Sequence, residues 1–93
     1  MPALSKSEIA THLVEVPAWE ADGGILTRTF AFQDFRAALR FVNAVGELAE
    51  EAGHHPDIDI RYNRVRLALT THDAGGLTQK DFDLATQAQK LPA

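Results

Sequence analysis

Apolar and polar residues recur along the chain with two different periods, and these periods predict its helices and strands. The helical period predicts a short helix over residues 6–14 and a long helix over residues 34–52, which Gly53 is placed to end. A third helix is expected to start near Thr78 and Asp81, because an apolar side follows them. That side consists of Phe82, Leu84, Ala85 and Ala88.

Between these helices, apolar residues alternate with polar ones, which is typical of strands. The expected strands cover residues 19–21, 25–32, 58–60 and 65–69. Asp22-Gly23-Gly24 has the composition of a hairpin turn. The alternation changes phase after Ile60, which predicts a second turn near residues 61–64, with Asn63 suited to it. The sequence therefore predicts two hairpins.

The resulting order of elements is αββαββα, which is an α+β fold class. Two hairpins predict a four-stranded antiparallel sheet, and the helices are expected to cover one face of it. Residues 1–93 are expected to form a single domain. The large apolar residues of the long helix cover about half of its circumference, more than one sheet face requires. They are Phe35, Leu39, Phe41, Val42, Val45 and Leu48. This surplus predicts a second buried contact, with another helix or with another subunit.

Composition narrows the class of protein. Cysteine is absent, which excludes disulfides and thiolate metal sites, and reliance on packing alone favours a cytoplasmic protein. The net charge of −4 is unfavourable for binding nucleic acid. No apolar run is long enough to cross a membrane, and the first residues lack the pattern of a signal peptide. A short chain with 45% hydrophobic residues has a thin core, so self-association is expected.

Three of the four histidines, His54, His55 and His72, flank the expected third and fourth strands. If these strands pair, the start of one lies beside the end of the other, which brings the three histidines together. Imidazole titrates near neutral pH, so such a cluster can donate and accept protons. Pro56 favours an extended His55, and neighbouring extended residues point to opposite sides, so the two adjacent rings are expected to differ in role. Two alternatives stay open: separate surface histidines, or a zinc site.

Two carboxylates and one aromatic residue are further candidates. Glu50, near the end of the long helix, is the carboxylate closest to His54 by helical geometry and is placed to orient an imidazole. Asp81 is either a first-turn residue of the third helix or part of the site. The face of Trp19 suits a flat heterocycle, although a position in the core is an equally good interpretation.

One set of residues has a characteristic spacing: Glu50, His54, His55, Pro56, Tyr62, His72 and Asp81. This set resembles the signature of the pterin-4a-carbinolamine dehydratase family, and the resemblance spans residues 17–90. It implies a four-stranded antiparallel sheet with helices on one side. It also implies a hydro-lyase that dehydrates 4a-hydroxytetrahydrobiopterin to quinonoid dihydropterin in tetrahydrobiopterin recycling, with neither a metal nor an organic cofactor.

The resemblance assigns roles to the histidines. We expect His54 and His72 to form the acid–base pair. His55 is expected to bind and orient the pterin, and Glu50 to support the site, with Asp81 near it.

The substrate-binding residues are expected around this cluster. Thr70 and Thr71 resemble a polar segment that meets the edge of the pterin ring. Gly53 offers only its backbone where many relatives carry an acidic residue. Lys80 keeps the charge of a residue that is often arginine in relatives, but not its fork geometry.

A function of another class stays open. Some animal relatives also act as partners of a transcription factor through the long helix. The alternative is therefore a non-catalytic dimerisation or regulatory protein of the same fold. In either case the resemblance implies a homodimer or a homotetramer.

Overall fold

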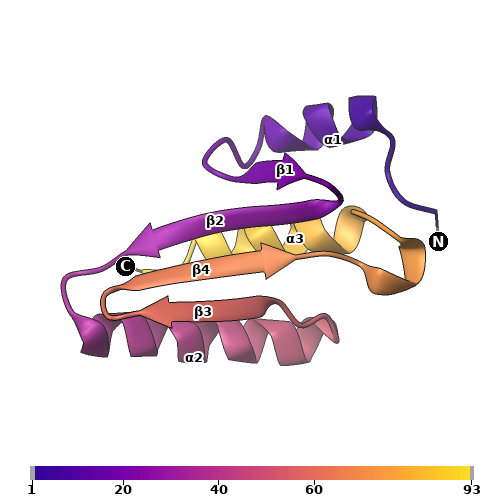
Figure 1. The fold of residues 1–93 in the computed structure, drawn as a ribbon. Helices are drawn as coiled ribbons and strands as arrows, with labels where there is room; N and C mark the ends of the chain where they lie inside the picture. Colours follow the sequence, from indigo (N-terminus) through magenta and orange to yellow (C-terminus); the bar gives the residue numbers. More distant parts are fainter. Residues whose placement is uncertain (1, 93) are drawn as a thin grey trace.

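The computed structural model describes residues 2–92 and contains a four-stranded antiparallel sheet with three α-helices (Figure 1). The elements are α1 (Lys6–Leu13), β1 (Glu20–Asp22), β2 (Ile25–Ala31), α2 (Phe35–Ala52), β3 (Asp57–Arg61), β4 (Arg64–Leu69), the short 3-10 helix η1 (His72–Ala74) and α3 (Gln79–Gln89). Apart from η1, which lies where a loop was expected, the order is the predicted one. The predicted α+β class is confirmed.

The sheet joins two hairpins in the strand order β1-β2-β4-β3. Its centre is the antiparallel pair β2–β4, whose register runs from Leu26 opposite Leu69 to Ala31 opposite Arg64. Strands β3 and β4 pair next to it, so the start of β3 lies beside the end of β4. This pairing sets the position of the segments that precede β3 and follow β4.

Local chemistry explains where α2 begins and ends. The Asp34 side chain accepts a hydrogen bond from the Ala37 N–H at 2.8 Å, which satisfies one of the free donors of the first turn. Gly53 ends the helix in the left-handed conformation, with φ 62°. No helix within residues 2–92 combines the length and the apolarity needed to cross a bilayer.

The turn between β3 and β4 lies where it was predicted and contains Tyr62 and Asn63. Tyr62, not Asn63, adopts a left-handed conformation, with φ 53°. The Asn63 amide instead donates to the Phe32 carbonyl at 2.9 Å and ties the turn to the end of β2. The hydrogen bond explains why asparagine suits this position although it does not supply the positive φ.

The core lies between the sheet and two helices. Figure 1 shows α2 and α3 behind the sheet, and α1 beside β1. Leu26, Val65, Leu67 and Leu69 of the sheet are buried against apolar residues of α2 and α3. In α2 the buried residues include Phe41 and Val45, and in α3 they include Phe82, Leu84, Ala85 and Ala88, which is the predicted apolar side.

The surplus apolar surface of α2 is only partly covered within the chain. Phe35 and Leu39 remain 46% and 37% exposed. On the edge strand β3, Ile58 and Ile60 pair with Leu67 and Val65, so they point to the helix-covered face. They are nevertheless 37% and 36% exposed, as are the other residues of this edge strand.

Candidate active site

A cavity of about 320 Å³ lies where β3 begins and β4 ends. The structure brings His54, His55 and His72 to this one cavity, as the pairing of these strands requires. Its other lining residues are Gly53, Thr70, Thr71, Asp73 and Lys80. All of these except Asp73 were candidates from the sequence.

His54 is held by a buried carboxylate. Its Nε2 lies 2.5 Å from Oδ1 of Asp81, which is fully buried, and the His54 side chain is only 11% exposed. A carboxylate accepts hydrogen bonds and does not donate them, so the proton of this contact belongs to Nε2 of His54. Asp81 therefore fixes the orientation of the ring and leaves Nδ1 as the nitrogen available to a ligand.

Two threonines hold Asp81 in turn. Oδ2 of Asp81 accepts hydrogen bonds from the Thr71 hydroxyl at 2.9 Å and from the Thr78 N–H at 3.0 Å. The two threonine hydroxyls are 2.9 Å apart. Because the single hydroxyl proton of Thr71 goes to Asp81, the Thr78 hydroxyl donates to Thr71. A buried charge is tolerated only when such partners satisfy it, and Asp81 has a full set of them.

Both interpretations of Asp81 therefore apply at once: it lies in the first turn of α3 and it contacts His54. Sequence reasoning missed the contribution of Thr78. The available signal was the capping pattern formed by Thr78 and Asp81, which places the two residues together at a helix start.

His55 contacts a different carboxylate. Its Nε2 hydrogen-bonds Oε2 of Glu50, and both side chains are largely exposed. Glu50 was expected to be the carboxylate nearest to His54, but Asp81 takes that place. The two adjacent rings thus have separate carboxylate partners, although both line the same cavity.

His72 opens η1, in the segment that follows β4. Hydrogen bonds from Thr71 N to Gly76 O at 3.1 Å and from Ala74 N to Thr71 O at 3.1 Å shape this segment. The His72 side chain is exposed at the rim of the cavity. Asp73 also lines the cavity and was not predicted; its position directly after His72 was the only signal.

The remaining binding candidates lie on the cavity wall. The Thr70 hydroxyl donates to the Gly24 carbonyl at 2.7 Å, which ties the end of β4 to the β1–β2 turn. Gly53 contributes backbone in its left-handed conformation. Lys80 places a positive charge at the exposed side of the cavity.

Two residues singled out in the sequence lie elsewhere. Trp19 is only 3% exposed, packs edge-to-face on Phe30 in the core, and does not line the cavity. Its large apolar surface gains more from burial than from exposure to a ligand, so the core interpretation describes it. Tyr62 is 66% exposed in the β3–β4 turn, at the end of the sheet opposite the cavity (Figure 1).

Among the described residues, no three side chains of His, Cys, Asp or Glu are arranged to hold a metal ion. The two adjacent histidines illustrate the reason. His54 and His55 turn to Asp81 and Glu50 respectively, so their Nε2 atoms do not converge.

Comparison with known proteins identifies the family to which the chain is similar. The family described as "Pterin 4 alpha carbinolamine dehydratase" matches residues 2–91. A protein of Chloroflexus aurantiacus named "Putative pterin-4-alpha-carbinolamine dehydratase" is 59% identical over 91 residues, which cover 98% of either chain. One of the same name from Thermomicrobium roseum is 56% identical, again over 98% of both chains.

Solved structures extend the comparison to the fold. A protein from Brucella melitensis described as a "transcriptional coactivator/pterin dehydratase" superposes with a TM-score of 0.90 at 32% identity, covering 94% of this chain and 95% of its own. A pterin dehydratase-like RuBisCO assembly factor of the alpha-carboxysome shares the fold, with a TM-score of 0.63 at 22% identity over 75% of this chain and 81% of its own. The matched family, the full-length relatives and the superposed fold together show that the chain belongs to the pterin-4a-carbinolamine dehydratase family.

Proposed function

We propose that the protein is a hydro-lyase that converts 4a-hydroxytetrahydropterin to quinonoid dihydropterin and water. The observation that carries this proposal is the position of three imidazoles on one cavity, with His54 fixed by the buried Asp81. The names of the full-length relatives support the same reaction.

The reaction requires one proton donor and one proton acceptor. The bond between C4a and the hydroxyl oxygen breaks while the neighbouring ring nitrogen supplies its lone pair and forms a double bond to C4a. An imidazolium gives its proton to the departing hydroxyl, which leaves as water, and a second imidazole accepts a ring proton. Positioned acid–base groups of this kind contribute roughly 10²–10⁴ to a rate.

We assign these two roles to His54 and His72. Asp81 holds the His54 ring through Nε2 and leaves Nδ1 as the nitrogen that can face the substrate. His72 faces the same cavity from η1, where its exposure leaves the ring free to exchange protons with water. In this proposal the chain's own side chains perform the chemistry, with neither a metal nor an organic cofactor.

His55 is assigned to substrate binding, with Glu50 fixing its ring. Thr70, Thr71 and the Gly53 backbone line the polar wall where the edge of a pterin would lie, and Lys80 supports the site with its charge. We place the reaction in tetrahydrobiopterin recycling and the protein in the cytoplasm. We also propose that the whole chain forms a single domain that carries out this reaction.

The test is a dehydratase assay on the purified, folded protein in the presence of a chelator. We expect water loss from 4a-hydroxytetrahydropterin to be faster than in buffer, and unaffected by the chelator. A folded sample that is no faster than buffer would contradict the proposal, and activity that the chelator removes would point to a metal.

The second candidate function is that of a partner protein without catalysis. The exposed Phe35 and Leu39 on α2 favour it, because an apolar helix face is a docking surface. The Brucella melitensis relative is described with both roles. The dehydratase assay separates the two functions, because a pure binding protein does not accelerate the reaction.

We also propose that the chain forms a homodimer or homotetramer through this face. Phe35 and Leu39 on α2, with Ile58 and Ile60 on the edge strand β3, leave apolar surface exposed on the helix-covered side. A second copy would remove this surface from water, a gain that a small core benefits from.

A further inference from the structure

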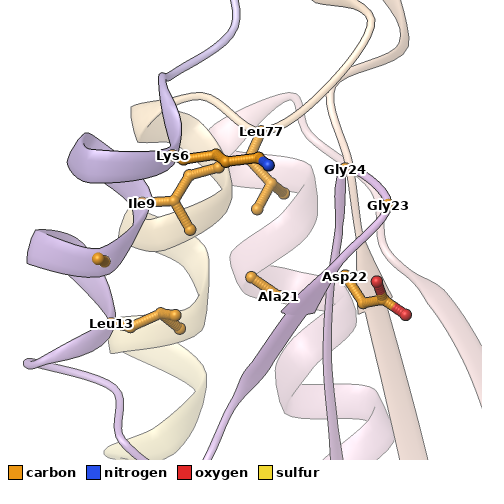
Figure 2. A pocket seen from close by; sticks show the side chains of 9 residues that line it. Lys6, Ile9, Leu13, Ala21, Asp22, Gly23, Gly24 and Leu77 are labelled. Carbon is orange, nitrogen blue, oxygen red and sulfur yellow. The ribbon is translucent and has the colours of Figure 1, made fainter.

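A second groove lies away from the histidines, between α1 and the β1–β2 hairpin (Figure 2). Its volume is about 460 Å³, larger than the cavity of the histidines and within the range of small-molecule sites. None of the residues assigned to dehydration lines it.

The walls of this groove are apolar. Ile9 and Leu13 project into it from α1, and Ala21 and Leu77 face them from β1 and from the segment before α3 (Figure 2). Gly23 and Gly24 form the hairpin end, so backbone alone limits the groove there.

The helix over the groove is held mainly by its flanks. No residue of α1 is buried, whereas Val16 after it is fully buried, and the Leu4 N–H before it donates to the Leu77 carbonyl at 2.8 Å. Ile9 and Leu13, the large apolar residues of α1, are therefore only partly buried. A ligand in the groove would remove their surface from water, which is the main source of affinity for an apolar body.

One charge dominates the mouth of the groove. The Lys6 side chain extends across the opening toward Gly24 and Leu77 (Figure 2), and no carboxylate within residues 2–92 pairs with it. Asp22 turns its carboxylate away from α1 (Figure 2).

The nearby Glu8 does not neutralise Lys6 either. Its carboxylate accepts the Ser5 N–H at 2.8 Å at the start of the helix. This hydrogen bond is the main reason why the pKa of Glu8 is lowered. The carboxylate is therefore engaged in the helix cap, and the ammonium group of Lys6 is left for a ligand.

We propose that this groove binds a small carboxylic acid with a compact apolar body, such as an aromatic ring on a two-carbon chain. The ring would lie among Ile9, Leu13, Ala21 and Leu77, and the carboxylate would meet Lys6 at the mouth. A cationic ligand would meet a like charge there, and a neutral one would leave Lys6 without a partner.

The test is a titration of the full chain with 3-phenylpropionate, followed by methyl NMR. We expect saturable shifts in the methyl groups of Ile9, Leu13 and Leu77, with the ring signals of His54 and His72 unchanged. The amide 3-phenylpropanamide keeps the ring and loses the charge. It should bind about twofold to fivefold more weakly, the loss typical of an exposed charge pair. Binding is measured without turnover, so the result is independent of dehydratase activity.

Two variants sharpen the test. Lys6→Gln should weaken the acid by the same factor and leave the amide unchanged, whereas Lys90→Gln, an exposed lysine outside the groove, should change neither. Ala21→Phe should fill the groove and abolish binding of both compounds. Lys6 is exposed, so its variant keeps the test decisive even if Ala21→Phe does not fold.

Three results would overturn the proposal. The first is equal affinity for acid and amide, and the second is an affinity that Lys6→Gln leaves unchanged. The third is a shift of the same methyl groups with protein concentration in the absence of ligand, which would show that a second copy of the chain fills the groove.

Discussion

Asp81 links the fold and the proposed chemistry at the scale of single residues. It accepts hydrogen bonds from His54, from the Thr71 hydroxyl and from the Thr78 N–H, and it is fully buried. Removing any one of these donors leaves a buried charge short of a partner. His54→Ala should therefore destabilise the fold as well as change the site, and His72 is the cleaner position at which to test catalysis.

Thr71→Val should lower the free energy of unfolding by roughly 1.5–3 kcal/mol, because hydrogen bonds to charged groups have about that value. Denaturant unfolding monitored by circular dichroism measures it. Thr29→Val is the matched control, since Thr29 lies exposed on β2 and should change stability by less than about 0.5 kcal/mol. Equal stability of the two variants would show that Thr71 does not support Asp81.

If His72 has the proposed acid–base role, His72→Ala should reduce kcat by roughly 10²–10⁴-fold. Its side chain is exposed, so the variant should keep its stability. His55→Ala should instead raise KM and leave kcat nearly unchanged, as expected of a residue that binds substrate equally in the ground and transition states. Steady-state kinetics on both variants measure the difference. If His55→Ala abolishes turnover while binding stays intact, the assigned roles are wrong.

At the scale of elements, periodicity was enough to predict the helices and strands. The apolar side of α3 and the limits of α2 follow from side-chain pattern and caps, both of which are local properties of the sequence. The strand order was not predictable in the same way, because the pairing of β2 with β4 depends on packing between the two hairpins. The carboxylate partner of His54 also depends on packing between distant elements. The sequence favoured Glu50, which is close along the chain, whereas the packing of α3 places Asp81 against His54.

His54 and His55 directly follow the C-terminal end of α2, so the way the helix ends determines their position. Gly53 ends the helix by adopting the left-handed conformation. A Cβ at this position would meet no atom within 4 Å, so the cost of Gly53→Ala is backbone strain alone. We expect Gly53→Ala to lower stability by roughly 1–2 kcal/mol. Gly53→Asn should recover part of it, since asparagine tolerates the left-handed conformation. Thermal unfolding of both variants measures this order, and an alanine variant as stable as the wild type would contradict it.

At the scale of the whole molecule, α2 has one apolar face in the core of the chain and a second apolar face that remains exposed. Phe41 and Val45 are buried in the core of the chain, whereas Phe35 and Leu39 remain exposed. The apolar surplus predicted from the sequence is therefore divided between the chain's own core and a surface available to another subunit.

Leu39→Glu should split the proposed assembly and leave the helix content unchanged, because it places a charge on the exposed face. Val45→Glu is the control and should unfold the chain, since it buries a charge without a partner. Light scattering alongside circular dichroism distinguishes the two outcomes. A wild-type chain that is monomeric at micromolar concentration would defeat the proposed homo-oligomer.

The central pairing of β2 with β4 also has a consequence for the order of folding. Each hairpin closes a short loop and can form early, but the central pair joins strands separated by the whole of α2 and β3. The loop between such distant strands must close, at a cost in chain entropy, before their contacts can form. Non-local pairing therefore slows folding. His54 and His72 flank the β3–β4 hairpin, whereas Asp81 arrives with α3. We therefore expect recovery of the ordered His54 ring during refolding to follow formation of the complete sheet, and not formation of the local hairpin.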